Sequence, residues 1–159
     1  DGIRDFCLSR GLGDVYKRQD IEFNSDGTIV YVIGTENDGI DQWTLSSPYD
    51  IGSLEVASPK NTDIGDDPRG FKFSNDGKKL FIVHHLGASQ STTGRVDEFT
   101  LTTPYDLDTM TQTNELTLSY SGIGGRRQGI NFSSDGYKLF ITNSATDSSW
   151  NSPITSAHV

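Results

Sequence analysis

Residues 70–83 read GFKFSNDGKKLFIV, and the chain contains three copies of the core of this stretch. FSNDG at 73–77 corresponds to FNSDG at 23–27 and to FSSDG at 132–136, at offsets of 50 and 59 residues. A second block, WTLSSPYDI at 43–51, returns as FTLTTPYDL at 99–107. Two blocks that recur in the same order indicate tandem copies of one structural unit.

Each copy has the pattern of short β-strands, which is clearest in the second copy. Phe71 and Phe73 alternate with polar residues, an Asp-Gly pair follows, and residues 80–83 form an apolar run. This pattern indicates a strand with one apolar face, a tight hairpin and a strand buried on both faces. A third strand is expected at 96–101 and a weaker fourth at 116–120; the first copy predicts the same two at 40–45 and around Leu54 and Val56.

Four antiparallel strands per unit, repeated in tandem, are typical of β-propeller blades. The sequence therefore predicts an all-β partial β-propeller, with blade 1 at 20–68, blade 2 at 69–127 and about half of a third blade at 128–159. A sandwich or meander with chance similarity is the alternative. Closed propellers typically have 4–8 blades, so missing blades of the same chain are expected partners.

The second copy is six residues longer than the first between its two blocks. The extra residues fall between His84 and Gly94. We expect this range to form an exposed loop between the second and third strands of blade 2.

The stretch at 70–83 resembles the repeat of TolB-type and YVTN-type bacterial propellers, whose blades open with G-x-x-F-S-x-D-G-K-x-L-Y-V. The resemblance covers the first half of each of the three units. The LSSPYDI block is similar to one in uncharacterised repeat proteins of bacteria and phage. These resemblances imply the fold and no catalytic residues, because propeller families share blades across unrelated functions.

Residues 1–19 differ in character from the repeats. SRGLGDVYKRQ at 9–19 resembles the translation of a transposase-based sequencing adapter, and DGIRD at 1–5 that of the primer preceding it. Three residues lie between the two, as the index of such a library requires. We therefore interpret residues 1–19 as a non-native segment that packs little against the repeats. A natural amphipathic tail is the alternative.

The composition narrows the range of partners and locations. Residues 20–159 carry 9 basic and 19 acidic side chains, which disfavours nucleic acid and anionic membranes. The single cysteine, Cys7, lies in the adapter-like segment, so the repeats offer no cysteine nucleophile or metal ligand. No stretch is long and apolar enough for a membrane helix. The composition is compatible with an extracellular, periplasmic or cell-surface protein.

Two recurring motifs have a binding interpretation and a structural one. Asn24 and Asp26 resemble spaced calcium ligands, but the glycine follows too early and no glutamate closes the loop. We expect a turn in which Asp bonds locally and Gly adopts positive φ. In the Pro-Tyr-Asp motifs at 48–50 and 104–106, we expect Pro to end a strand, Asp to accept a local N–H and Tyr to pack near a blade junction.

Four residues are candidate ligand contacts. Arg69 precedes the first strand of blade 2, and Arg127 and Gln128 precede that of blade 3. If the first strands line the channel, these side chains approach its mouth, where guanidinium groups suit a carboxylate or phosphate. Alternatively, Arg69 balances the acidic pair before it. His84 is a candidate single ligand or pH-sensitive contact, against a solvated-loop interpretation.

The leading functional hypothesis is a non-catalytic binding or scaffolding module of a bacterial or phage surface or secreted protein. Such a module recognises a protein or glycan through its blade loops. The alternative is a propeller enzyme, a lactonase or other hydrolase, with polar residues converging on the channel. The sequence predicts no catalytic residue, because no serine–histidine–acid order with a nucleophile-elbow pattern occurs. No metal site and no cofactor are predicted.

We expect the chain to self-associate. A blade without neighbours keeps apolar surface in water, which applies to the first unit, with Phe23, Val30, Val32 and Trp43, and to the incomplete third unit. Exposed apolar patches of this kind normally drive association. Light scattering at micromolar concentration tests this, and a stable cooperative monomer would contradict the propeller interpretation.

Overall fold

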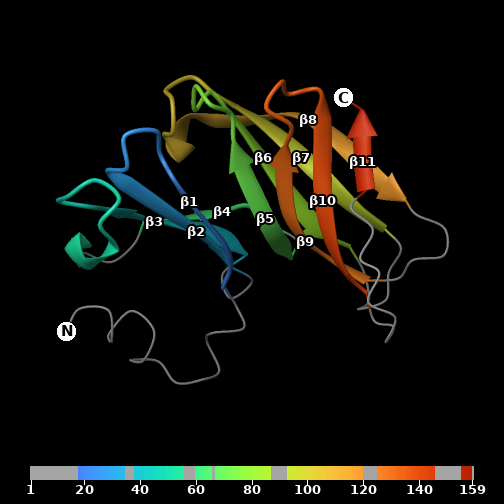
Figure 1. Cartoon of the computed structure of the whole chain (residues 1–159), viewed down its shortest axis with the longest axis horizontal. Helices are drawn as coiled ribbons and strands as arrows, with labels where there is room; N and C mark the ends of the chain where they lie inside the picture. Colours follow the sequence, from blue (N-terminus) through green and yellow to red (C-terminus); the bar gives the residue numbers. More distant parts are fainter. Residues whose placement is uncertain are drawn as a thin grey trace.

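The computed structural model describes residues 18–34, 38–55, 60–65, 67–86, 93–119, 125–145 and 155–158. They form three antiparallel sheets that follow one another along the chain and lie side by side (Figure 1). The interpretation of residues 1–19 concerns positions that, up to residue 17, lie outside the described residues. Arg18 and Gln19 begin the first strand.

The first sheet has the strand order β1-β2-β3-β4. The strands are β1 (Arg18–Phe23), β2 (Ile29–Gly34), β3 (Gly39–Thr44) and β4 (Lys60–Asp63). The expected position of the fourth strand is wrong, since Leu54 forms only an isolated bridge with Leu45, and Val56 lies outside the described residues. β4 is polar and largely exposed, so apolar alternation does not mark it.

The second and third sheets repeat the same plan. The second contains β5 (Pro68–Phe73), β6 (Lys79–His85), β7 (Thr93–Leu101) and β8 (Met110–Ser119) in that order. The third contains β9 (Gly125–Phe132), β10 (Lys138–Ala145) and β11 (Thr155–His158), with β10 in the middle. Short 3-10 helices, η2 (Ile51–Ser53) and η3 (Leu107–Thr109), follow β3 and β7. The predicted all-β repeat architecture is confirmed.

The Asp-Gly turns are built alike in all three sheets, which confirms the turn interpretation. In each, the Asp carboxylate accepts the backbone N–H two residues later, at 3.0 Å for Asp26 and 3.1 Å for Asp76 and Asp135. The glycines that follow have φ of 73°, 69° and 76°. This left-handed backbone favours glycine, because a side chain clashes with its own main chain there.

A tyrosine covers this turn in the first two sheets. The Tyr105 N–H donates to the Gly77 carbonyl at 2.9 Å, and the hydroxyl donates to the Asn75 carbonyl at 3.2 Å. In the first sheet Tyr49 makes the same two contacts, to the Gly27 and Ser25 carbonyls. Each tyrosine thus ties the end of its third strand to the first hairpin of the same repeat.

The acidic residue after each tyrosine has the local role expected of it. Asp50 accepts the N–H of Gly52 at 2.9 Å, and Asp106 accepts the N–H of Asp108 at 3.1 Å. These bonds cap η2 and η3, since a short helix leaves its first N–H groups without partners.

The apolar cores lie between neighbouring sheets. The core between the first and second sheets contains Tyr31, Ile33, Ile40, Phe71, Phe73, Leu80, Ile82, Phe99, Leu101 and Leu107. In this core, the Tyr31 hydroxyl of the first sheet donates to the Tyr105 carbonyl of the second sheet at 2.6 Å. This contact confirms the prediction that Tyr105 lies at a blade junction. The core between the second and third sheets contains Val83, Val96, Leu118, Ile130, Leu139 and Ile141.

One expectation about exposed apolar surface is wrong. Val30 and Val32 are only 2% and 4% exposed. Phe23 and Trp43 lie directly opposite Val30 on β1 and β3, and these larger side chains flank it on the same face of the sheet.

Candidate ligand-binding site

The four candidate contacts lie at one end of the second sheet. Antiparallel pairing places the start of β5 beside the end of β6, and the end of β6 beside the start of β7. β9 packs against β5 and β6, with its Gln128 carbonyl against Gly70. Arg69 lies in β5, His84 in β6, and Arg127 and Gln128 in β9.

The prediction of an exposed loop from His84 to Gly94 is wrong at both ends of the range. His84 and His85 belong to β6 and are 0% and 3% exposed, and Gly94 belongs to β7. The strands extend this far because His84 pairs across the ladder with Arg95 and both share a buried carboxylate. Residues 87–92 lie outside the described residues.

That carboxylate belongs to Asp97 of β7. His84 Nε2 lies 3.2 Å from Asp97 Oδ2, and Arg95 Nε donates to the same oxygen at 3.0 Å. Burial by itself raises the pKa of the Asp97 carboxyl, but the hydrogen bond from His84 and the charge of Arg95 outweigh it. The pKa therefore lies below its ordinary value of 3.8, and Asp97 is ionised at neutral pH.

Acidification is expected to weaken the fold through Asp97. Because its pKa is lower in the folded chain, its contribution to stability is complete above pH 3.8 and is lost as pH falls through the folded-state pKa. Burial raises the pKa of Asp20 and Glu22, so their contribution is complete at low pH and is lost as pH rises. Urea unfolding of the wild type and D97N between about pH 7 and about pH 3 isolates the first effect. We expect a flatter pH dependence in D97N; parallel curves would contradict this.

Arg69 is held by an acidic neighbour. Its Nη2 lies 2.7 Å and 2.8 Å from the two carboxylate oxygens of Asp67. The ladder shifts register between Pro68 and Gly70, so Arg69 occupies a bulge. Its Nε is buried and has no hydrogen-bond partner among the described residues. Arg69 thus balances Asp67, as the alternative interpretation expected.

Arg127 extends from β9 over the second sheet. It is 1% exposed, and a Cβ placed on Gly94 would lie 3.0 Å from its Cγ and 3.3 Å from its Nε. Gly94 and Arg95 point to opposite faces of β7. Arg127 therefore approaches this end of the sheet from one face, while the Asp97 cluster occupies the other.

Sequence reasoning missed Arg95 and Asp97. Both lie on the face of β7 that carries the apolar Phe99 and Leu101, and two opposite charges spaced two residues apart on such a face indicate a buried ion pair.

We call Asp67, Arg69, His84, Arg95, Asp97, Arg127 and Gln128 the basic end. Among the described residues it contains three arginines and two carboxylates, and the Asp20 carboxylate lies beside it, 3.4 Å from a Cβ placed on Gly70.

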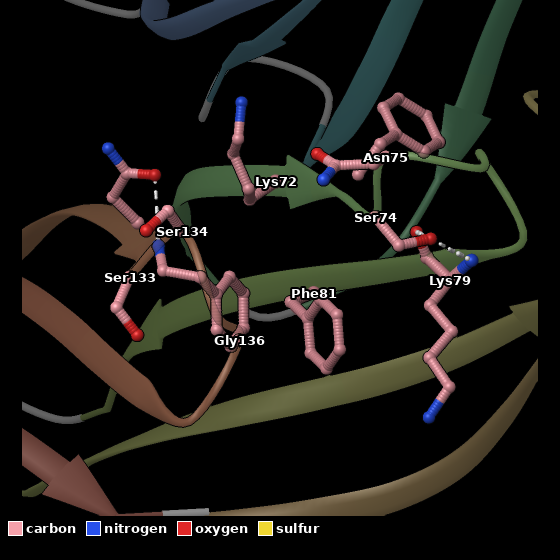
Figure 2. A pocket seen from close by; sticks show the side chains of 11 residues that line it. Lys72, Ser74, Asn75, Lys79, Phe81, Ser133, Ser134 and Gly136 are labelled. Atoms are coloured by element: carbon pink, nitrogen blue, oxygen red, sulfur yellow. Dashed lines mark hydrogen bonds between the residues drawn. The ribbon is translucent and has the colours of Figure 1, made fainter.

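Two pockets lie elsewhere, between the second and third sheets. One of about 330 Å³ lies between the two Asp-Gly turns, with Ser74 and Asn75 on one side, Ser133 and Ser134 on the other, and Phe81 between them (Figure 2). A second of about 420 Å³ is lined by Val96, Glu98, Asn114, Leu116 and Leu139, among others. Both are lined by Lys79, Phe81, Phe132 and Gly136, and together we call them the junction groove. None of the four predicted contacts lines it.

Two kinds of feature are not found among the described residues. Within the described ranges, no group of three or more His, Cys, Asp or Glu side chains is arranged to hold a metal ion. In the same part of the chain, we find no helix with the length and apolar character that crossing a membrane requires.

Known proteins resemble this chain in structure and not in sequence. No protein-family model and no curated protein matches it. The periplasmic gluconolactonase PpgL of Pseudomonas aeruginosa matches with a TM-score of 0.53 and 18% identity, over 89% of this chain and 41% of its own. A protein from Lactobacillus plantarum matches with a TM-score of 0.56 and 16% identity, over 87% of this chain and 40% of its own. The chain thus spans about two fifths of either protein.

The fold is therefore that of a β-propeller, and the described residues form two four-stranded blades and three strands of another. At such low identity the likeness concerns the fold alone. The finer resemblance to TolB-type and YVTN-type repeats stays a prediction.

Proposed function

We propose that this chain forms part of a propeller hydrolase of the lactonase type, and that its basic end binds a hydroxyl-rich carboxylate ligand. The observation that carries the proposal is the gathering of Arg69, Arg95 and Arg127 at this end, on a chain whose net charge is −9. A local positive field on an acidic protein attracts anions. The likeness to a gluconolactonase supports a sugar acid or its lactone as the ligand.

The residues of the basic end have distinct roles in this proposal. Asp67 fixes the Arg69 guanidinium, and the 10% of the Arg69 side chain that is exposed is the part that a carboxylate reaches. Gln128, on the neighbouring inner strand, offers both a donor and an acceptor to hydroxyl groups. During lactone hydrolysis, water adds to the carbonyl carbon, the ring C–O bond then breaks, and a proton from the water ends on the ring oxygen as a hydroxyl. Negative charge develops on the carbonyl oxygen between these steps, and a guanidinium stabilises it. His84 is buried and acts as a positioning residue that holds Asp97 and the end of β6.

Calorimetric titration with gluconate tests the binding step, with glucose as the uncharged control. We expect R69Q to bind gluconate about tenfold more weakly or worse, because a hydrogen bond to a charged group contributes roughly 1.5–3 kcal/mol. Lys60→Gln is the matched control, since Lys60 is an exposed cation on β4 paired with Asp108. This variant should bind like the wild type.

Hydrolysis of gluconolactone, followed in a pH-stat, tests the catalytic step. If the chain binds gluconate but does not hydrolyse gluconolactone, the hypothesis of a non-catalytic binding module is favoured over that of a hydrolase. If R69Q and K60Q bind gluconate equally, or the wild type does not bind it, the proposal is wrong.

A further inference from the structure

The junction groove occupies a place that is filled at the preceding blade junction. Between blades 1 and 2, the Tyr31 and Phe73 rings lie 4.9 Å apart, and the Tyr105 ring lies 5.2 Å from Phe73. By repeat position, Phe81 and Phe132 correspond to Tyr31 and Phe73, and their rings lie 4.6 Å apart at the same interplanar angle of 56°. The counterpart of Tyr105 would therefore lie in the groove.

The glycine of each Asp-Gly turn also shows whether a tyrosine ring covers the turn. A Cβ placed on Gly77 would lie 2.3 Å from the Tyr105 ring, and one on Gly27 would lie 2.4 Å from the Tyr49 ring. Gly136 has the same left-handed backbone, yet none of the described residues lies within 4 Å of the corresponding point. In this part of the chain, the third turn thus has the shape that accepts a ring but has no ring over it.

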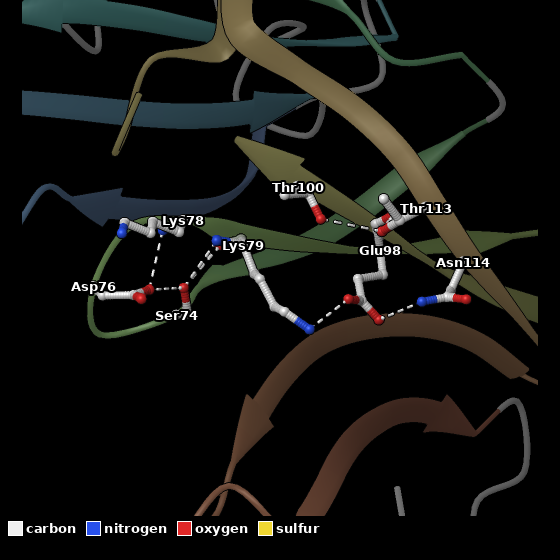
Figure 3. A network of polar contacts seen from close by, with 8 residues as sticks. All are labelled: Ser74, Asp76, Lys78, Lys79, Glu98, Thr100, Thr113 and Asn114. Carbon is white, nitrogen blue, oxygen red and sulfur yellow. Dashed lines mark hydrogen bonds and ion pairs between the residues drawn. The ribbon is translucent and has the colours of Figure 1, made fainter. Parts of the chain in front are cut away.

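Three of the four charged side chains that line the groove are paired, Lys72 with Glu22 and Lys79 with Glu98. Lys79 Nζ donates to Glu98 Oε1 at 2.7 Å, and Asn114 Nδ2 donates to Glu98 Oε2 at 3.2 Å (Figure 3). Phe81 and Phe132 supply its aromatic surface. Because most of its ionic groups are paired, the groove suits an apolar or aromatic occupant better than a charged one.

The strand register of the third sheet also points to the turn at Gly136. Lys138 pairs with His158 of β11 as Lys79 pairs with Thr100 and Ile29 with Thr44. Tyr105 follows Thr100 by five residues, and Tyr49 follows Thr44 by five. β11 therefore has the register that delivers a tyrosine to the turn in the first two blades.

We propose that the junction groove is the acceptor site for a Pro-Tyr-Asp-Leu segment of the repeat's own type. Its tyrosine ring covers Gly136 and packs against Phe132. Its hydroxyl donates to the Ser134 carbonyl, which corresponds to the Ser25 and Asn75 carbonyls that accept from Tyr49 and Tyr105. This proposal is independent of the proposed hydrolase function, since no basic-end residue lines the groove.

Fluorescence anisotropy with a labelled synthetic peptide tests the site. The probe is LTTPYDLDTM, the sequence of residues 101–110. We expect saturable binding, weaker by at least about tenfold when Ala replaces the tyrosine, because ring burial supplies most of the contact. Phe in its place should weaken binding by roughly three- to tenfold, because one hydrogen bond is lost.

Two glycine variants test the location. Gly136 and Gly65 both have positive φ, no described residue lies within 4 Å of a Cβ placed on either, and Asn tolerates this backbone. G136N should abolish peptide binding, whereas the matched control G65N should retain it, with circular dichroism confirming that both fold. Equal binding of the Tyr and Ala peptides, or binding by G136N, overturns the proposal. If the peptide does not bind and G136N abolishes self-association in light scattering, the occupant is a second copy of the chain and the proposal is equally wrong.

Discussion

Replacing Asp97 with asparagine is expected to lower the free energy of unfolding by about 3 kcal/mol, the scale on which a broken buried ion pair destabilises a protein. Asp97 is 2% exposed, its Oδ2 accepts from Arg95 Nε, and His84 Nε2 lies 3.2 Å from the same oxygen. Asparagine keeps the volume and one acceptor oxygen, so the loss reports the missing charge. Urea unfolding at neutral pH, extrapolated linearly to water, measures it.

Asp41→Asn is the matched control, because Asp41 occupies the position of Asp97 in the first repeat. It is only half-buried and accepts from the Asn61 side chain at 2.8 Å. The positions corresponding to His84 and Arg95 are Gly34 and Gly39, which carry no charge. D41N is therefore expected to cost less than about 1 kcal/mol. Equal losses in the two variants would show that the strand position matters and the buried cluster does not.

The turns could be predicted from the sequence because their interactions are local. The Asp76 carboxylate accepts an N–H only two residues away, and Gly77 supplies the positive φ that the same tight turn requires. Tyr105 also meets this turn within its own repeat, whereas the sequence predicted only that it packs near a blade junction. The strands β5 and β6 follow from apolar patterns on either side of the turn.

The basic end could not be predicted in the same way. His84 meets Asp97 across a strand pair whose length depends on how far the ladder continues, and adjacent histidines at a repeat insertion resemble a solvated loop. Arg69 was placed before its strand because a bulge interrupts the alternation there. The junction groove depends on contacts between blades, which no pattern within one repeat contains.

Replacing Tyr105 with alanine is expected to destabilise the chain by about 3 kcal/mol, at the lower end of the range for deleting a packed aromatic ring. Its half-buried ring covers Gly77 and lies 5.2 Å from that of Phe73, at the junction of blades 1 and 2. Equilibrium unfolding in urea measures the loss.

Tyr49→Ala provides the comparison, because Tyr49 covers the Gly27 turn with the same hydrogen bonds but is 58% exposed. The two residues have φ of 60° and 63°, so the backbone cost of alanine is the same in both and cancels. We expect Tyr49→Ala to cost about 1 kcal/mol, since less apolar surface leaves water at this position. A much larger loss at Tyr105 would locate the effect in the blade junction. Equal losses would mean that the tyrosine stabilises its own hairpin and contributes little to the blade junction. A tyrosine would then not be expected to stabilise the junction groove either.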